Sequence, residues 1–538
     1  MAASATSGAV AKPFETRRRV PVLPGWTVMA AATVAVVSRL PFLGRAPSPD
    51  EAGYLLVGAQ WDGAGRSLYG SYWVDRPPLL VTIFRAASQL GGLPALRLIG
   101  CAAVLLIVLG SAHAAALLGG RSAGRWAAVA AVALCTSPLM GSYRVNGEML
   151  AAPFVLGGMI AVIRALRAPE RGAAGRRALA AGAMAMCALL IKQNFADVAV
   201  FGAVAFTVSW VHGDVTRRRF TSLMSWAALG AATVLVVTAG WTVLHGTSLT
   251  AVLDAMYPFR VRAGRVLAAD DSRHATARLH GLVSAAVTSG LAVLVALALL
   301  DVATRRRRSA LSWALVTLLV FAGASVLVGG SYWHHYLMGL VAPVAVTAGV
   351  LAGGRGPFVR PAITYVAAAA AVSWCLSLGA AQGSVGQAVG TSIGAVSRPG
   401  DTIVNLYGHA DIVQTSGLPS PYPQLWSLPA KTLDPRLTAL DAVLTGPTAP
   451  TWIVTGPSVR SWGLQTAATA GVIARDYRDV GTICGRTIYL HDGISRTPPG
   501  AGTSCHGTTS PLTPLKELRH GRRPARSADR EGAVDAAA

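Results

Sequence analysis

The sequence predicts an α-helical polytopic membrane protein with a small α/β domain near its C-terminal end. Of its 538 residues, 53% are hydrophobic and only 13% are charged, about half the charged fraction of a typical soluble domain. Long apolar runs fill residues 26–382, and short β-like runs follow them. The net charge of +23 is concentrated in short basic clusters between apolar runs. This arrangement is typical of cytoplasmic loops and not of a nucleic-acid-binding protein.

Eleven segments are long and apolar enough to be predicted membrane spans, since crossing the hydrocarbon core takes about 20 residues. They lie near residues 26–44, 95–119, 122–141, 147–166, 176–191, 194–211, 222–244, 279–301, 309–329, 335–353 and 361–382.

The basic loops give the orientation. Arg17–Arg19 precede the first span, which places the N-terminal segment, residues 1–25, in the cytoplasm. Counting spans from there puts the later clusters on the same side, and these are Arg121 with Arg125, Arg164 to Arg177, Arg217–Arg219, Arg305–Arg308, and Arg355 with Arg360. With eleven spans the C-terminal domain is extracytoplasmic. We therefore expect a multi-pass protein of the plasma membrane.

The first outer loop, residues 45–94, contains one ambiguous segment. Residues 77–91 are apolar, but the segment is short and carries Arg85. Treating it as a span would invert every later loop. We therefore expect a helix that lies on or dips into the outer interface.

After the last span the sequence predicts an extracytoplasmic α/β domain, residues 383–493, and a disordered tail, residues 494–538. Its β-like runs are separated by Gly, Pro, Asp and Ser, and they lie at residues 402–407, 442–444, 451–454 and 487–490. Cys484 and Cys505 could form a disulfide if this region is extracytoplasmic, and the sequence leaves that pairing open.

An adjacent acidic pair, Asp50 and Glu51, follows the first span. The stretch from Ser48 to Glu51 fits a helix-capping box with Pro at the first helical position. A helix starting here would also place Asp50 and Tyr54 on one face. A carboxylate held at the membrane edge could then act as general base toward an acceptor hydroxyl. Both interpretations stand at this point.

Two basic residues of the outer loops are candidates for binding phosphate. Arg76 precedes Pro77 and Pro78, and it could either sit among lipid headgroups or hold a phosphate through paired hydrogen bonds. Lys192 lies in an outer turn, where it could extend toward the interface or contact a phosphate. Outer loops are otherwise poor in basic residues, which favours the phosphate contact for Lys192.

Three further outer segments each allow two interpretations. Glu148 opens the fourth span behind Asn146, and it either complements the helix dipole or contacts an acceptor. His334 and His335 lie in an aromatic stretch typical of a membrane interface, and two adjacent histidines make a weak metal site. The basic stretch 257–265 is interpreted as a contact with anionic lipid, with an anionic substrate as the alternative.

Together these stretches resemble the GT-C superfamily of integral-membrane glycosyltransferases. The likeness is to the family 39-like branch that contains protein O-mannosyltransferases and the lipid A aminoarabinose transferase. It rests on residues 50–54, 76–79 and 148–150, with weaker similarity at residues 97–100, 136–138 and 335–337. It covers residues 26–382. Arg76 stands where the family usually has Lys.

The resemblance implies a function. Such enzymes transfer a hexose or pentose from a polyprenyl-phosphate donor to a lipid, glycan or protein acceptor at the outer face of the membrane, with inversion. In this chain it implies a catalytic pair, Asp50 as general base beside Glu51. It also implies Arg76 and Lys192 at the donor phosphate. The remaining substrate-binding candidates are Tyr54, Glu148 and His335. No cofactor is required, although a divalent metal ion would be compatible.

Two other classes of function are considered. A transporter or flippase predicts ionisable residues deep within spans and paired repeats, and neither is clear in this sequence. A non-catalytic polyprenyl-lipid-binding protein would use Asp50 only as part of a helix cap. Loss or survival of activity without the Asp50 carboxylate separates these classes from a glycosyltransferase.

Overall fold

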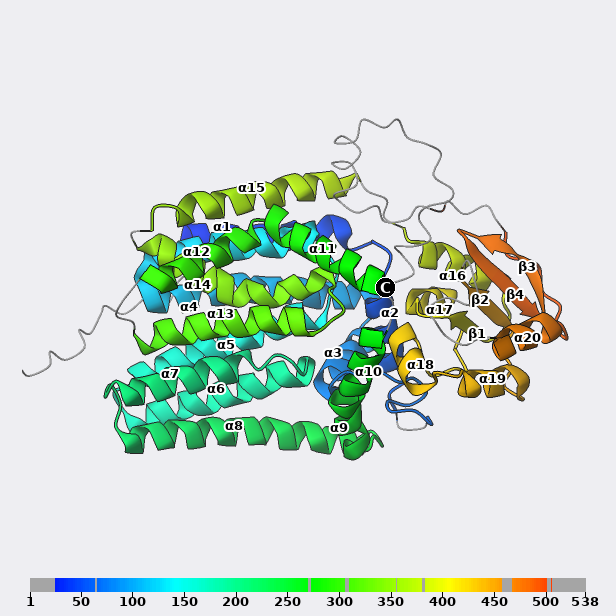
Figure 1. Ribbon diagram of the computed structural model, residues 1–538, viewed down its shortest axis with the longest axis horizontal. Coiled ribbons are helices and arrows are strands. Elements are labelled where there is room, and N and C mark those ends of the chain that lie inside the picture. Colours follow the sequence, from blue (N-terminus) through cyan, green and yellow to red (C-terminus); the bar gives the residue numbers. More distant parts are fainter. Residues whose placement is uncertain are drawn as a thin grey trace, which may run out of the picture.

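The computed structural model describes residues 25–62, 65–269, 272–304, 309–354, 356–379, 383–456, 467–500 and 505. Long helices form a bundle, and a small α/β domain sits at one end of it (Figure 1). Several predictions fall outside the described residues: residues 1–24 of the cytoplasmic segment, the basic residues Arg305–Arg308 and Arg355, and most of the predicted tail.

The bundle agrees with a polytopic membrane protein. Its helices are α1 (Trp26–Val37), α4 (Leu93–Thr136), α5 (Gly147–Arg167), α6 (Arg171–Ile191), α7 (Asp197–Val211), α8 (Arg217–Leu244), α11 (Ser272–Thr288), α12 (Leu291–Thr304), α13 (Ala310–Val328), α14 (Val341–Gly353) and α15 (Val359–Leu378). Among the described residues, seven segments are long and apolar enough to cross a membrane, or eight if α11 and α12, bent by 73°, form one broken span. Each of the eleven predicted spans coincides with helix, but the number that cross stays a prediction.

Helix α4 accounts for two of the predicted spans. Gly120 interrupts it with a φ of 82°, a conformation that glycine adopts without strain. A Cβ on Gly124 would lie 2.8 Å from the carbonyl oxygen of Ala112, twelve residues earlier. In a straight helix these positions would be about 18 Å apart. The chain therefore turns back at Gly120, and the two halves of α4 pack against each other.

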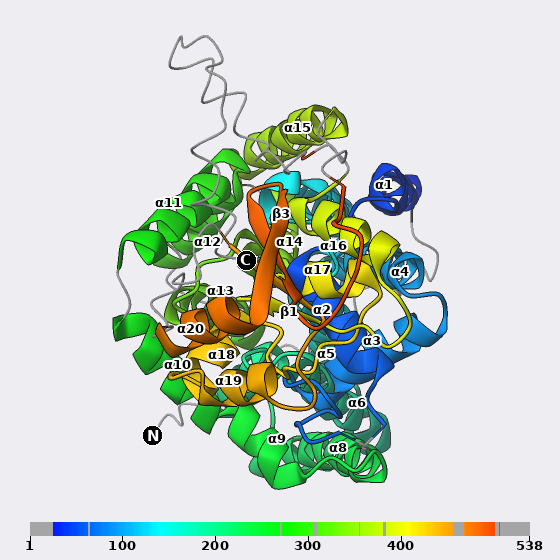
Figure 2. The same cartoon turned by 90° about the vertical axis from the view of Figure 1, so that its right-hand side faces the viewer.

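The structure also has shorter helices, which are η1 (Leu40–Phe42), α2 (Pro49–Ala59), α3 (Pro78–Gln89), η2 (Pro138–Met140), α9 (Leu249–Met256), α10 (Pro258–Ala269) and η3 (His334–Leu340). Those labelled α2, α3, α9 and α10 gather at the end of the bundle that faces the C-terminal domain (Figures 1 and 2). Helix α3 confirms the short helix predicted at residues 77–91, and it buries Leu80, Val81, Phe84 and Ala87 along one face. Its location at the membrane interface stays a prediction.

The C-terminal domain is a four-stranded sheet with helices. Its elements are α16 (Val385–Val396), β1 (Ile403–Leu406), α17 (Ala410–Ser416), α18 (Ser427–Leu433), α19 (Thr438–Thr445), β2 (Trp452–Thr455), α20 (Ala467–Asp476), β3 (Tyr477–Ile483) and β4 (Arg486–His491). The strand order is β1-β2-β4-β3, with β1 and β2 parallel and the other pairs antiparallel.

Three of the four predicted strands are confirmed, as β1, β2 and β4. The strand predicted at residues 442–444 is wrong, because this stretch lies in α19, where Leu440 and Leu444 are buried at helical spacing. Strand β3 was not predicted, since its middle is largely exposed and lacks an apolar alternation. Cys484 and Cys505 form a disulfide with their Cα atoms 5.2 Å apart.

The C-terminal domain rests on the first outer loop. Helix α17 packs against α2, and α18 packs against α10. Two hydrogen bonds fasten the loop: the Trp73 amide donates to the Pro423 carbonyl over 3.1 Å, and the Tyr72 hydroxyl accepts from the Ser420 amide over 2.9 Å. The loop that carries the acidic pair is therefore held between the bundle and the domain.

Candidate active site

Helix α2 presents the acidic pair, and its predicted capping box is confirmed. The Ser48 hydroxyl accepts from the Glu51 amide, while the Glu51 carboxylate accepts from the Ser48 amide over 3.0 Å. Pro49 occupies the first helical position, where its missing N–H costs nothing. The cap fixes where the helix starts. Asp50 and Glu51 are therefore consecutive residues of the first helical turn, and their carboxylates point in different directions.

Glu51 points into the protein and is fully buried. Its carboxylate forms an ion pair with Arg97, at 2.8 Å and 2.9 Å for the two oxygens. It also accepts from the Val145 amide over 2.8 Å. These contacts tie α2 to α4 and to the loop before α5. They are the contacts of a structural anchor, and none of them supports the catalytic role predicted for Glu51, which stays a prediction.

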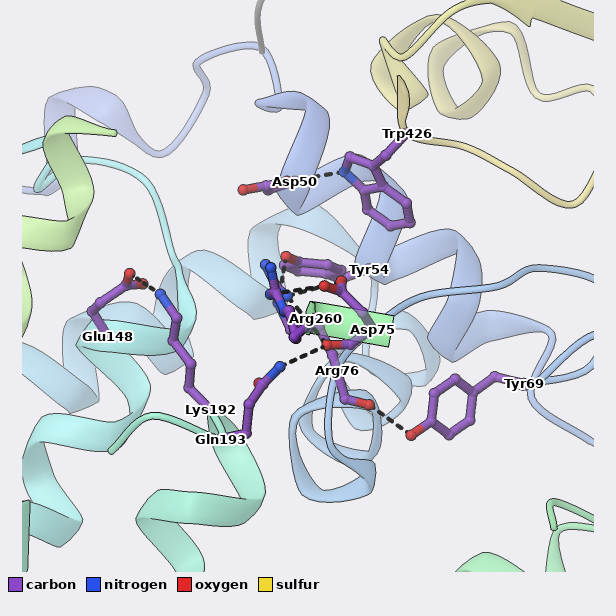
Figure 3. A network of polar contacts seen from close by, with 10 residues as sticks. All are labelled: Asp50, Tyr54, Tyr69, Asp75, Arg76, Glu148, Lys192, Gln193, Arg260 and Trp426. Atoms are coloured by element: carbon purple, nitrogen blue, oxygen red, sulfur yellow. Dashed lines mark hydrogen bonds and ion pairs between the residues drawn. The ribbon is translucent and has the colours of Figure 1, made fainter. Parts of the chain in front are cut away.

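Asp50 points the other way and is partly exposed. Its Oδ1 accepts a hydrogen bond of 3.0 Å from the indole N–H of Trp426, a residue of the C-terminal domain (Figure 3). Within the described part of the chain no group donates a hydrogen bond to Oδ2. One carboxylate oxygen is thus held in place, and the other has no bonding partner among these residues.

Arg76 lies beside Tyr54, and Tyr54 follows Asp50 by about one turn of α2. Its Nε donates to the Tyr54 hydroxyl over 2.9 Å, and its guanidinium pairs with Asp75 over 2.9 Å. Burial alone would lower the pKa of Arg76, but Asp75 and Tyr54 more than offset it and hold the pKa well above its ordinary value. Burial raises the pKa of the Tyr54 hydroxyl well above its ordinary value. At neutral pH Arg76 is therefore charged, and the Tyr54 hydroxyl keeps its proton.

A second cation reaches the same carboxylate. Arg260, from α10, pairs with the other oxygen of Asp75 over 2.7 Å. The side-chain amide of Gln193 donates to the backbone carbonyl of Asp75 over 3.2 Å. Burial would raise the pKa of Asp75, but Arg260 and Arg76 together hold it below its ordinary value. One carboxylate thus pairs with two guanidinium groups.

The predicted residues from α5, α6 and η3 also converge. Lys192 forms an ion pair with Glu148, and its ammonium lies 4.3 Å from the centre of the Tyr336 ring. His335 Nε2 is 4.0 Å from the same Glu148 oxygen. Asn146 caps α5 by accepting from the Met149 amide over 2.9 Å. Figure 3 shows Glu148 and Lys192 approaching from the side of the network opposite Tyr69.

The structure therefore brings most of the sequence candidates to one end of the bundle. Asp50, Tyr54 and Arg76 form one group, Glu148, Lys192 and His335 form another, and Gln193 connects the turn after Lys192 to Asp75. The described residues contain no group of three or more His, Cys, Asp or Glu side chains that could hold a metal ion.

Two members of the site were missed or misjudged from the sequence. Trp426 was missed, because its neighbours match no motif. Arg260 belongs to the basic stretch that was interpreted as a lipid contact, and its guanidinium instead enters the polar network. The signal for Arg260 was its position in a predicted outer loop, where basic residues are unusual.

An open polar cleft of about 720 Å³ adjoins the segment that leads into Asp75 and Arg76. It lies between the first outer loop, α9 and the C-terminal domain, and Trp73 forms part of its wall. Hydroxyl, amide and charged side chains also line it, namely those of Arg66, Ser67, Ser71, Asp254, Ser420 and Gln424.

No protein-family model matches the sequence, and no curated protein matches it. Several solved structures do match this chain. The structure of ArnT from Cupriavidus metallidurans bound to undecaprenyl phosphate matches with a TM-score of 0.56 and 17% identity, over 86% of this chain and 97% of that one. The structure of the oligosaccharyltransferase AglB from Archaeoglobus fulgidus, in complex with an inhibitory peptide and a dolichol-phosphate, matches with a TM-score of 0.50 and 13% identity. That match covers 87% of this chain and 74% of the other. The chain therefore has the same fold as these two proteins, the GT-C fold that its motifs predicted.

Proposed function

We propose that this protein is a glycosyltransferase that moves a sugar from a polyprenyl-phosphate carrier to an acceptor hydroxyl. The observation that carries the proposal is the Asp50 carboxylate, one oxygen of which accepts no hydrogen bond within the described residues. It lies in the same group as Tyr54 and the charged Arg76. The fold supports it, because the similar structures of ArnT and AglB were solved with undecaprenyl phosphate and a dolichol-phosphate.

The cations have a defined task in this reaction. As the bond between sugar and phosphate breaks, the phosphate gains negative charge. We assign Arg76 and Lys192 to that phosphate and add Arg260, since all three are held around Asp75 and Glu148 before any donor binds. A cation aimed at developing charge lowers the barrier by about 3–4 kcal/mol, by analogy with single-donor deletions.

Asp50 acts as the general base in this mechanism. Its Oδ2 accepts the proton of the acceptor hydroxyl, and the resulting nucleophile attacks the sugar from the side opposite the phosphate. This direct displacement inverts the anomeric carbon. A positioned base contributes about a hundredfold or more. Tyr54 holds Arg76 in this scheme, and substrate contacts of Tyr54, Glu148 and His335 stay predictions.

The same proposal places the site on the extracytoplasmic side. Lys192 follows the last residue of α6, so the beginning of that helix and the nearby Arg167, Arg171 and Arg177 lie toward the opposite end of the bundle. That end is cytoplasmic by the distribution of basic residues. The disulfide between Cys484 and Cys505 supports an oxidising compartment for the C-terminal domain. The open polar cleft supports a hydrophilic acceptor.

The test is sugar transfer by the purified full-length protein in lipid nanodiscs. It is supplied with radiolabelled polyprenyl-phosphate hexoses and pentoses and with membrane extracts as acceptors. We expect transfer from one of these donors and a product of inverted anomeric configuration by NMR. Binding of polyprenyl phosphate without transfer from any donor would contradict the proposal and would favour a lipid-binding protein.

A further inference from the structure

We propose that Trp426 positions the Asp50 carboxylate for proton transfer, so that the C-terminal domain completes the active site. This inference rests on the proposed function above. Trp426 is 376 residues from Asp50 in the sequence, and its indole N–H makes the only hydrogen bond that the Asp50 carboxylate accepts within the described residues.

Trp426 contacts two members of the first group, Asp50 and Tyr54. Besides its bond to Asp50, its ring lies 5.3 Å from the Tyr54 ring, centre to centre. The Tyr54 hydroxyl in turn accepts from Arg76. One side chain of the C-terminal domain therefore touches the proposed base and the residue that holds the proposed phosphate-binding cation (Figure 3).

The first outer loop leaves room for this indole. Gly53 lies between Asp50 and Tyr54 on α2, and a Cβ there would lie 2.3 Å from Cζ2 of Trp426. The same Cβ would come within 3.1 Å of Ala410 at the start of α17. A glycine inside a helix costs roughly 0.5–1 kcal/mol relative to alanine. At this position it permits the close approach of the domain to α2.

The chemistry of indole decides the role. An indole N–H donates one hydrogen bond and accepts none, so Trp426 cannot take up the acceptor proton. A carboxylate turns easily about its last torsion. Fixing Oδ1 holds Oδ2 in one direction, and a small misplacement of a reacting group is costly in rate. Trp426 is thus a positioning residue that acts through Asp50.

The first experiment compares Trp426→Phe with the native chain. Phenylalanine keeps a ring beside Tyr54 but removes the N–H. We expect kcat to fall about tenfold or more, as for a lost hydrogen bond to a charged group, while the KM for the donor changes less than about twofold. The matched control is Trp452→Phe, because Trp452 is buried in β2 and its N–H has no partner within the described residues. That control should transfer sugar at the native rate.

A double-mutant cycle separates this role from a merely structural one. If Trp426 acts through Asp50, Trp426→Phe should cost nothing further once Asp50→Asn is present. Gly53→Ala disturbs the contact between α2 and Trp426 by adding a Cβ on the α2 side. Alanine itself is favourable in a helix. This variant should lower kcat in the same way, even if Trp426→Phe proves hard to fold.

Each outcome bears on a different claim. Native kcat in folded Trp426→Phe and Gly53→Ala, or losses that simply add to that of Asp50→Asn, would overturn the positioning role and leave the proposed function standing. Full activity in Asp50→Asn would overturn the base assignment and this inference with it. The absence of transfer by the native chain would remove the proposed function first.

Discussion

The two faces of α2 carry neighbouring carboxylates in opposite situations. On the inner face, Glu51 is fully buried and accepts from Arg97, Ser48 and the Val145 amide. On the outer face, Asp50 accepts one hydrogen bond, from Trp426, and is partly exposed. Both oxygens of the inner carboxylate accept hydrogen bonds, and this carboxylate anchors the loop. The outer carboxylate has one oxygen without a hydrogen bond from the described residues, and that oxygen can take up a proton.

The difference shows why an acidic pair is a poor guide to which of its members reacts. A catalytic base needs an oxygen that can reach a substrate proton. A buried carboxylate needs every oxygen paired, since an unpaired buried charge is costly. Adjacent residues on a helix point about 100° apart. One motif can therefore supply an anchor and a base at once.

The largest expected effect on stability comes from the inner face. Glu51→Gln leaves the buried Arg97 without its counter-charge, and breaking one side of a buried ion pair costs about 3–5 kcal/mol. We expect a clear fall in the thermal unfolding midpoint in detergent. Adding Arg97→Gln removes the stranded charge and should recover part of the loss. If Glu51→Gln instead unfolds like the native chain but no longer transfers sugar, Glu51 belongs to the chemistry.

The next effect lies on the outer face. Arg76→Ala removes a cation from the proposed phosphate site, and we expect kcat for transfer to fall by about 10²–10³-fold. Arg76→Lys keeps the charge but not the bond from Nε to Tyr54, so its loss should be smaller. Arg262→Ala is the control, since within the described residues Arg262 pairs only with the exposed Asp254. Equal rates for all three variants would remove Arg76 from the mechanism.

The smallest effect is a dependence of stability on pH. The pKa of Asp75 lies below its ordinary value of 3.8. Its ion pairs therefore contribute fully above that value, and the contribution disappears as the pH falls through the lower folded-state pKa. Between pH 7 and pH 3 the unfolding midpoint of the native chain should fall further than that of Asp75→Asn. Parallel curves would show that Asp75 does not stabilise the fold through its charge.

The local features of the fold were predictable from the sequence. The capping box at Ser48 and Glu51 and the short helix α3 follow from residues close in the chain, and so do the helices that coincide with the predicted spans. Strand β3 was not predictable, because it is stabilised by its ladder with β4 and not by its own apolar pattern.

The site was predictable in its parts and not in its pairings. Asp50 was identified from the acidic pair after the first predicted span, Arg76 from the two prolines that follow it, and Lys192 from its place in a predicted outer turn. That Glu51 pairs with Arg97, or that Arg260 shares Asp75 with Arg76, depends on helices that meet only in the folded protein. Trp426 carries no local signal at all, since its role comes from the docking of the C-terminal domain on Gly53.

The outer carboxylate of α2, Asp50, is proposed to be the base of a sugar transfer from a polyprenyl-phosphate donor. The most direct measurement is the transfer rate of Asp50→Asn in nanodiscs, beside Asp214→Asn as a control. Asp214 is exposed in the loop between α7 and α8. We predict a fall of about 10²–10⁴-fold for Asp50→Asn, native transfer for Asp214→Asn, and unchanged unfolding midpoints for both. Native transfer by folded Asp50→Asn would contradict the account.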